Sequence, residues 1–328
     1  MGVCIGCLPR YTPVCVGCFK KKGNKMGILL GDFTAAFQHD SKGAGGTRVK
    51  ALQVFKSLQS FGKTAKWGDT TPGNLTSKQV AGYIKHRATT IGARSVQNEA
   101  AIIRRTVKGA GREVGDLSNK SNNWGNSRLG VPSATRTAGA KAPIDGAKFA
   151  AAREKLSSSM QVVVDLQRSL GLRRQEAVKA TNAKEWQTSL TNAIAQDRGV
   201  YLSLSGDAGS KGGRPRHIYV HAGRTGSVLQ AVNAAVSAKK ASGNGQILGQ
   251  YDDLKSAVNG YANALVYAGL TGSDSGHGLR REWACQQYDH YIDQGLDKDT
   301  ALARLSQDLG HGDGRGRWVE NNYISGRK

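Results

Sequence analysis

Four residues late in the sequence are of types that carry nucleophilic or acid–base chemistry. His277 and Arg280 stand three apart in the segment HGLRR, so on a helix their side chains would project from the same face. His311 follows in LGHGD, and Tyr323 comes twelve residues later. A tyrosine hydroxyl can act as a covalent nucleophile once a neighbouring group takes its proton. The combination indicates attack by a tyrosine on an electrophilic centre such as phosphorus.

Groups suited to the same chemistry occur earlier in the chain. Arg173 and Glu176 stand three apart in GLRRQEAV, after an apolar helical stretch that begins at Met160, and Lys211 precedes a Gly-Gly turn in SKGGRPRHIYV. A guanidinium group binds two non-bridging phosphate oxygens at once, and an ammonium group can protonate a leaving oxygen. The set is what we expect of an enzyme that cleaves a phosphodiester through a covalent intermediate.

The order of these motifs resembles the tyrosine recombinase family, which comprises phage and mobile-element integrases. The resemblance rests on G-L-R-x-x-E at 171–176, K-G-G-R-P-R at 211–216, H-x-L-R at 277–280, L-G-H at 309–311 and a tyrosine after them. Each motif alone is weak, because arginine-rich helices are common. All five in this order make a chance match implausible, and the resemblance covers residues 145–328 best.

The resemblance implies a specific reaction on DNA. Tyr323 would attack the scissile phosphorus, form a 3′-phosphotyrosyl bond and release a 5′-hydroxyl. Arg173 and Arg280 would bind the non-bridging oxygens, and Lys211 would be the general acid for the leaving oxygen. The phosphotyrosine keeps the energy of the broken bond, so the resemblance implies religation without ATP, metal or any other cofactor.

Supporting roles follow for three more residues. His277 and His311 would hydrogen-bond the phosphate or help to remove the tyrosine proton, since a phenol with a pKa near 10 needs such help at neutral pH. Glu176 would hold the cationic groups in place; the alternative is a surface charge partner within its helix.

The position of the nucleophile leaves alternatives. The segment GDGRGRWVEN puts more residues between His311 and Tyr323 than the commonest spacing of the family. Tyr288 and Tyr291 are therefore alternatives, although neither follows the L-G-H motif.

The resemblance also implies partners. These are double-stranded DNA at specific attachment sites, a homotetramer on paired sites, and an accessory DNA-bending or directionality protein. Two other functions stay open: a type IB-like topoisomerase that relaxes supercoils as a monomer, and a DNA-binding protein with a degenerate catalytic site.

The bulk properties agree with a nucleic-acid partner. The chain has 328 residues, a net charge of +23 and a pI near 10, and its positive charge is spread along the sequence. This indicates a polyanionic partner, with a ribosomal or generic basic protein as the alternative. No apolar run is long enough for a membrane span and no secretory signal is recognisable, so we expect a protein of the cytoplasm, associated with the nucleoid of a prokaryote or of a phage host.

Apolar patterning predicts a mainly α-helical fold with a small β-hairpin, that is, an α+β protein with two domains. A cysteine-rich extension occupies residues 1–25, a helical core-binding domain 26–108, a basic flexible linker 109–143, and the catalytic domain 144–328. The linker prediction rests on the Gly, Ser and Asn content of that stretch and on its lack of apolar periodicity.

The cysteine-rich extension has two interpretations. Four thiolates in two C-x-x-C pairs can hold zinc tetrahedrally, although the intervening loop is shorter than is usual. Alternatively, translation begins at Met26 and the extension has no selected structure. The cysteines concerned are Cys4, Cys7, Cys15 and Cys18.

Helix signals mark the two domains. An apolar stripe at three-residue steps predicts a helix over 49–58, with Val49 as its first member. Thr76, Ser95 and Asp145 are predicted N-caps of later helices.

The run GVYLSLSGDAGSKGGRPRHIYVHA predicts a hairpin with Lys211 at its tip. A phosphate-binding nucleotide loop is the rival interpretation of this segment, but the Walker pattern is absent. Basic residues expected to contact the DNA backbone are Lys50, Lys85, Arg128, Arg136, Arg214 and Arg216.

Overall fold

The computed structural model describes residues 30–40, 45–119, 121–133, 142–206 and 215–326. The chain divides into two compact units, Met1–Thr135 and Arg136–Lys328, each of which is considered by itself. Several predicted residues lie outside the described ranges, and the predictions for them stay predictions: Cys4, Cys7, Cys15, Cys18, Arg136, Lys211 and Arg214.

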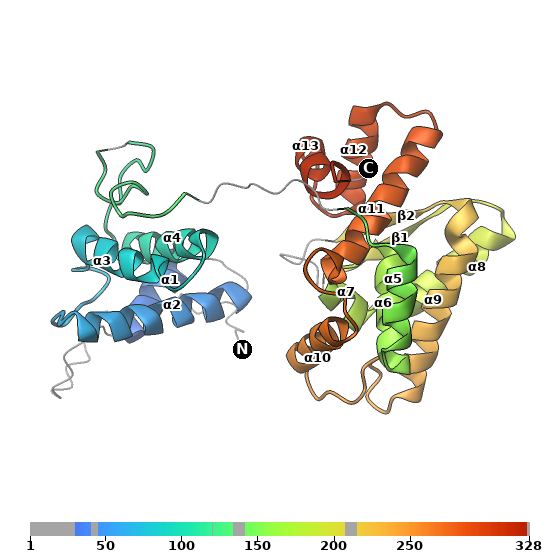
Figure 1. Ribbon diagram of the computed structural model, residues 1–328, viewed down its shortest axis with the longest axis horizontal. Helices are drawn as coiled ribbons and strands as arrows, with labels where there is room; N and C mark the ends of the chain where they lie inside the picture. Colours follow the sequence, from blue (N-terminus) through green and yellow to red (C-terminus); the bar gives the residue numbers. More distant parts are fainter. Residues whose placement is uncertain (1–29, 41–44, 120, 134–141, 207–214, 327–328) are drawn as a thin grey trace, which may run out of the picture. The chain divides into compact units, whose positions relative to one another are not determined.

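The first unit is helical. Its elements are α1 (Leu30–Asp40), α2 (Gly45–Thr64), α3 (Ser77–Ala88) and α4 (Ala93–Gly109). Helix α1 packs on α2 and α4, and α3 packs on α4 (Figure 1). Thr76 caps α3 as predicted, because its hydroxyl accepts from the Gln79 backbone N–H while the Gln79 side chain accepts from the Thr76 N–H.

Two details of the first unit differ from the sequence prediction. Val49 is 58% exposed and lies off the buried face of α2, which contains Phe55 and Leu58 of the predicted stripe together with Ala51 and Val54. Helix α4 begins two residues earlier than Ser95, at Ala93, with Gly92 as its N-cap, so Ser95 lies inside the helix. Gly at an N-cap offers no side-chain acceptor, which is why the sequence favoured the serine.

Part of the stretch predicted as a linker belongs to the first unit. Trp124, Leu129 and Val131 are buried in its core. Arg104 of α4 fixes the stretch: its Nε donates to the Trp124 carbonyl at 2.7 Å and its Nη2 to the Asn126 side chain at 2.7 Å. Turns that pack a few apolar side chains lack periodicity, so composition alone could not separate them from a linker.

The second unit contains the other helices and the described sheet (Figure 1). Its elements are α5 (Gly146–Glu154), α6 (Ser158–Leu170), α7 (Arg174–Lys179), α8 (Ala183–Ala195), β1 (Val200–Leu204), β2 (Arg216–Val220), α9 (Ala222–Ala241), α10 (Leu254–Tyr267), the 3₁₀ turn η3 (Gly272–Asp274), α11 (Gly276–Asp293), α12 (Lys298–Asp308), α13 (Gly316–Val319) and the π-helical turn η4 (Glu320–Ile324). None of the described helices combines the length and apolar composition that crossing a membrane requires.

Helices α8, α9 and α12 contact the hairpin, whose inner face joins the core of the unit. Helix α9 packs against both α6 and α8, while α11 packs against α6 and α12. Strands β1 and β2 are antiparallel, with Leu202 opposite Ile218. The mainly helical fold with a small hairpin is confirmed, and Asp145 caps α5 as predicted by accepting from the Lys148 N–H.

Gly171 makes the sharp turn that ends α6 and leads to Arg173. Its φ of +59° is left-handed, and a Cβ at this position would lie 2.4 Å from two ring atoms of Trp283. Glycine alone meets both demands, because it has no Cβ to strain or to collide. The turn therefore fixes how closely α6 approaches α11.

We expect Gly171→Ala to lower the free energy of unfolding by roughly 2–5 kcal/mol, because a left-handed non-glycine residue costs about 1–2 kcal/mol and overpacking about 1–3 kcal/mol. Calorimetric unfolding of the full chain measures the loss. The matched control is Gly295→Ala, where φ is +81° but no atom lies within 4 Å of the added Cβ. Equal losses in the two variants would contradict the close packing on Trp283.

Candidate active site

Arg280 is the buried centre of the site. It is 1% exposed and projects from α11, and each of its three guanidinium nitrogens has a partner. Nη1 donates to the Gly171 carbonyl, Nη2 to the Leu309 carbonyl at 2.5 Å, and Nε contacts the Tyr323 hydroxyl at 3.4 Å. Burial is the main cause of a lowered pKa for this arginine. Arg280 therefore connects three segments that are far apart in the sequence.

Arg173 approaches the same point from the start of α7. Its backbone N–H and its Nη1 each donate to the Glu176 carboxylate at 2.7 Å, and its Nη2 donates to the Leu309 carbonyl at 3.2 Å. The Leu309 carbonyl thus accepts from both Arg173 and Arg280. A shared acceptor holds the two guanidinium groups side by side, as binding of one phosphate would require.

Arg216 lies inside the site instead of on the protein surface. It is 5% exposed, and its Nη2 donates to Glu176 Oε2 at 2.7 Å. Its Nε and Nη1 are buried without a hydrogen-bond partner among the residues that the structure describes. Burial, followed by repulsion from Arg280, lowers the pKa of Arg216 well below the usual value. The expected contact of Arg216 with an exposed DNA backbone does not fit this placement.

Glu176 balances the positive charge of the three arginines. Its side chain is fully buried and accepts from Arg173 and Arg216. Burial alone would raise its pKa, but Arg216, Arg280 and Arg173 lower it more, so the net pKa is lowered. Glu176 is thus held as a carboxylate, and the alternative of a surface charge partner does not describe it.

Tyr323 is 1% exposed, and its hydroxyl faces the arginines. The oxygen lies 3.4 Å from Arg280 Nε and 3.4 Å from His311 Nε2. The Tyr323 ring also lies near two other rings, with centroids 5.5 Å from His277 and 6.1 Å from Trp318. The structure therefore brings together the predicted residues Arg173, Glu176, His277, Arg280, His311 and Tyr323.

The two histidines of the site favour the neutral form. Burial, followed by the charge of Arg280, lowers the pKa of His277 to about 4 and that of His311 to about 3. At neutral pH each ring therefore has one nitrogen free to accept a proton. His311 is also held by the ring of Trp318, whose centroid lies 4.5 Å away.

The alternative nucleophiles are placed differently. The Tyr291 hydroxyl donates to the Asp308 carboxylate, and burial together with this carboxylate raises its pKa. Tyr288 is 6% exposed and belongs to the hydrophobic core. Tyr323 is the tyrosine for which the structure gives contacts with both Arg280 and His311.

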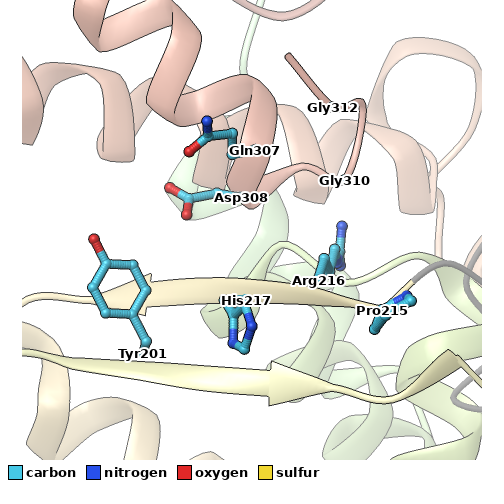
Figure 2. A pocket seen from close by; sticks show the side chains of 8 residues that line it. All are labelled: Tyr201, Pro215, Arg216, His217, Gln307, Asp308, Gly310 and Gly312. Atoms are coloured by element: carbon cyan, nitrogen blue, oxygen red, sulfur yellow. The ribbon is translucent and has the colours of Figure 1, made fainter.

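A cavity of about 670 Å³ lies beside the arginines. Figure 2 shows the strands of the hairpin on one side, with the end of α12 and the following turn on the other. Arg216 and Asp308 both line it, together with Tyr201, Pro215, His217, Gln307, Gly310 and Gly312. Among the described residues, no group of three His, Cys, Asp or Glu side chains is placed to hold a metal ion.

Three predicted DNA-contacting residues are exposed. Lys50, Lys85 and Arg128 have solvent-accessible side chains in the first unit, so their expected role remains available to them.

Two residues of the site were not predicted from the sequence to lie there. Arg216 had a signal that was not used, and Trp318 had none. In RHIYV the alternate residues Arg216, Ile218 and Val220 are buried, so the period of the strand places Arg216 on the inner face. Trp318 carried no comparable signal, because its contact with His311 depends on the turn between them.

Comparison with known proteins supports the resemblance. The family model described as Integrase matches residues 131–286. Among solved structures, a Tn1549 transposon integrase in complex with a circular intermediate DNA has a TM-score of 0.56 at 13% identity, over 91% of this chain and 95% of that one. A lambda integrase tetramer bound to a Holliday junction has a TM-score of 0.54 at 14% identity, over 91% and 77%. The search of curated proteins found no match.

The fold is therefore that of the tyrosine recombinases, as the order of the sequence motifs implied. The Integrase family model matches residues 131–286, just under half of the chain, and the solved structures agree with it in fold.

We expect ring-proton NMR of the free protein to give titration midpoints near 4 for His277 and near 3 for His311, because burial and the arginines disfavour both imidazolium forms. Ordinary imidazoles titrate near 6.5. Their folded pKa values lie below the unfolded ones, so the stability they contribute is present above pH 6.5 and is lost as pH falls towards 4 and then 3. Single His→Gln variants assign the signals, and a midpoint near 6.5 for either ring would contradict the described site.

Proposed function

We propose that the protein is a site-specific DNA recombinase that breaks and rejoins strands through a 3′-phosphotyrosyl intermediate, and that it integrates or excises a mobile element. The single observation that carries the proposal is the position of the Tyr323 hydroxyl, 3.4 Å from both Arg280 Nε and His311 Nε2. Contacts of this length are expected of a site without substrate, since catalytic hydrogen bonds tighten when the substrate binds. The match of residues 131–286 to the Integrase family model supports the same reaction.

In the cleavage step the Tyr323 oxygen forms a bond to phosphorus and the bond from phosphorus to the 5′-oxygen breaks. The phenol proton passes to His311, while Arg173 and Arg280 bind the two non-bridging oxygens and offset their growing charge. A bound phosphate also offsets the repulsion between the arginines and His311. Its negative charge therefore raises the His311 pKa and strengthens that ring as a proton acceptor.

We assign the leaving-group proton to Lys211, on the family resemblance. The ammonium group would protonate the departing 5′-oxygen, and religation would run the same transfers in reverse. Arg216 would act from inside the site by holding Glu176, and not as a contact to the DNA backbone.

The substrate is proposed to be double-stranded DNA carrying attachment sites. The net charge of +23 supports binding to a polyanion, and the similar integrases were solved in complex with DNA. A homotetramer on paired sites, an accessory DNA-bending or directionality protein, and action on cytoplasmic DNA complete the proposal. Lys50, Lys85, Arg128, Arg136 and Arg214 are proposed to contact phosphates outside the catalytic centre.

We expect Tyr323→Phe to abolish covalent trapping of DNA, with a loss of at least ~10³-fold, because no other group would form the phosphotyrosyl bond. The substrates are end-labelled nicked duplexes that tile the DNA flanking the gene, so that cleavage near the nick releases a short 5′-hydroxyl fragment. Tyr267→Phe is the matched control, since Tyr267 is 84% exposed. DNA binding by gel shift should survive in both variants.

Three outcomes would count against this proposal. If Tyr323→Phe still forms the adduct, another residue is the nucleophile. If the unmodified protein forms no adduct, the protein only binds DNA. Relaxation of supercoiled plasmid by monomers, without strand exchange between paired sites, would indicate a topoisomerase.

Lys211→Ala is expected to slow cleavage by about 10²–10⁴-fold, the usual contribution of a general acid. Replacing the bridging 5′-oxygen by sulfur should restore most of the rate, because a thiolate leaves without a proton far more readily than an alkoxide. Arg173→Ala is the control, since its loss affects the non-bridging oxygens and sulfur should not restore it. If sulfur does not restore the cleavage rate of Lys211→Ala, Lys211 is not the general acid.

A further inference from the structure

A second buried polar pair lies beside the catalytic centre. Asp308, the last residue of α12, is 4% exposed, and Tyr291 of α11 is 3% exposed. The Tyr291 hydroxyl donates to Asp308 Oδ2, and the backbone N–H of Tyr219 in β2 also bonds the carboxylate. The pair therefore joins α11, which carries His277 and Arg280, to the end of α12.

The residues directly after Asp308 form the turn that supplies the site. The Leu309 carbonyl accepts from Arg173 and Arg280, and the His311 backbone N–H donates to the Ser306 carbonyl at 2.9 Å. Gly310 between them has a φ of +64°, and a Cβ there would lie 2.8 Å from Arg216 Cδ. The turn has little room, so a displacement of Asp308 is passed on to the Leu309 carbonyl and to His311.

We propose that Asp308, held by Tyr291, is a positioning residue of the active site that sets the Leu309 carbonyl and the His311 ring for cleavage. It contacts no reacting atom, so it acts through the turn at 309–311. The proposal rests on the proposed function for its kinetic consequences. Its structural part, the anchoring of the turn, can be measured without DNA.

An ionised carboxylate suits this position better than an amide. Asp308 receives two donors, the Tyr291 hydroxyl and the Tyr219 N–H, and a carboxylate is purely an acceptor. The Tyr291 hydroxyl stays protonated because burial and the Asp308 carboxylate raise its pKa. The positive groups that face Asp308 are Arg216 of β2 and Arg304 of α12. An Asn would satisfy one donor with its oxygen and oppose the other with its amide hydrogens.

The anchor should weaken in mild acid. Burial raises the pKa of Asp308 to about 6, although Tyr291 and Tyr219 act in the opposite direction. Above this pH the carboxylate accepts both bonds, and below it protonation removes one acceptor position. Adduct formation should therefore decline as pH falls through about 6. The site histidines do not titrate in that range in the free protein, because their pKa values are about 4 and about 3.

The raised pKa of Asp308 also determines how its contribution to stability changes with pH. The folded pKa of Asp308 exceeds the unfolded value near 3.9, so its contribution to stability is fully present below that value and is lost as pH rises through about 6. At pH 7.5 the ionised carboxylate thus costs folding free energy.

The experiment compares Asp308→Asn and Tyr291→Phe with the full-length protein, using subsaturating nicked duplex so that the rate reports the free enzyme. We expect Asp308→Asn to form adduct about tenfold more slowly at pH 7.5 and to lose the decline near pH 6. Tyr291→Phe should keep the decline but shift it to higher pH, because a bond that lowers the Asp308 pKa is gone. The matched control is Asp299→Asn, which changes an exposed carboxylate of the same helix and should leave rate and profile unchanged.

Hydrogen exchange of the same variants without DNA completes the test. The His311 amide should exchange faster in Asp308→Asn and Tyr291→Phe than in Asp299→Asn, because the turn is less firmly held. Unchanged exchange, or a wild-type rate and pH profile in Asp308→Asn, would overturn the positioning role. If the unmodified protein forms no adduct at all, the proposed function fails, and the exchange result still decides whether Asp308 anchors the turn.

Discussion

Glu176 lies between arginines that would otherwise repel one another. Its fully buried carboxylate accepts hydrogen bonds from Arg173 and Arg216, and its charge also acts on Arg280. Removing one partner of a buried ion pair leaves an uncompensated charge in a medium of low polarity, which costs far more than the pair contributes. The arrangement of the helices around α7 therefore depends on this one carboxylate, and the rest of the site is built on the guanidinium positions that it fixes.

The charge balance also explains why the site suits an anion. Three guanidinium groups face one carboxylate at the centre, with Asp308 close to Arg216 on the cavity side. The site therefore carries net positive charge in the absence of substrate. Backbone carbonyls of the folded chain hold the Arg280 guanidinium group in position. Preorganised donors need no rearrangement when charge develops on a phosphate, which is the main way in which such sites lower a barrier. Burial, together with this positive charge, keeps His277 and His311 neutral in the absence of an anion.

Sequence reasoning predicted the fold class, most helices and the central constellation, because motif order and apolar periodicity are local signals. It did not place Arg216 inside the site, since a basic residue beside a hairpin tip is more often exposed, and only the alternation through Ile218 and Val220 indicates otherwise. The role of the Leu309 carbonyl could not be predicted for a different reason. Every residue has a backbone carbonyl, so the residue type does not indicate which one accepts. The packing of Trp124 in the first unit was likewise invisible, because a single buried tryptophan in a turn-rich stretch has no period.

The unusual spacing between His311 and Tyr323 shows what the site actually constrains. Residues five apart, such as Trp318 and Tyr323, would point about 140° apart on a regular α-helix. Here the π-helical turn at Glu320–Ile324 changes that relation, with the Ser325 N–H bonded to the Glu320 carbonyl, and both rings face His311. Single π turns inside helices are frequent at functional sites. The requirement falls on where the hydroxyl lies relative to Arg280, and the chain meets it with a π-helical turn at the end of the longer segment.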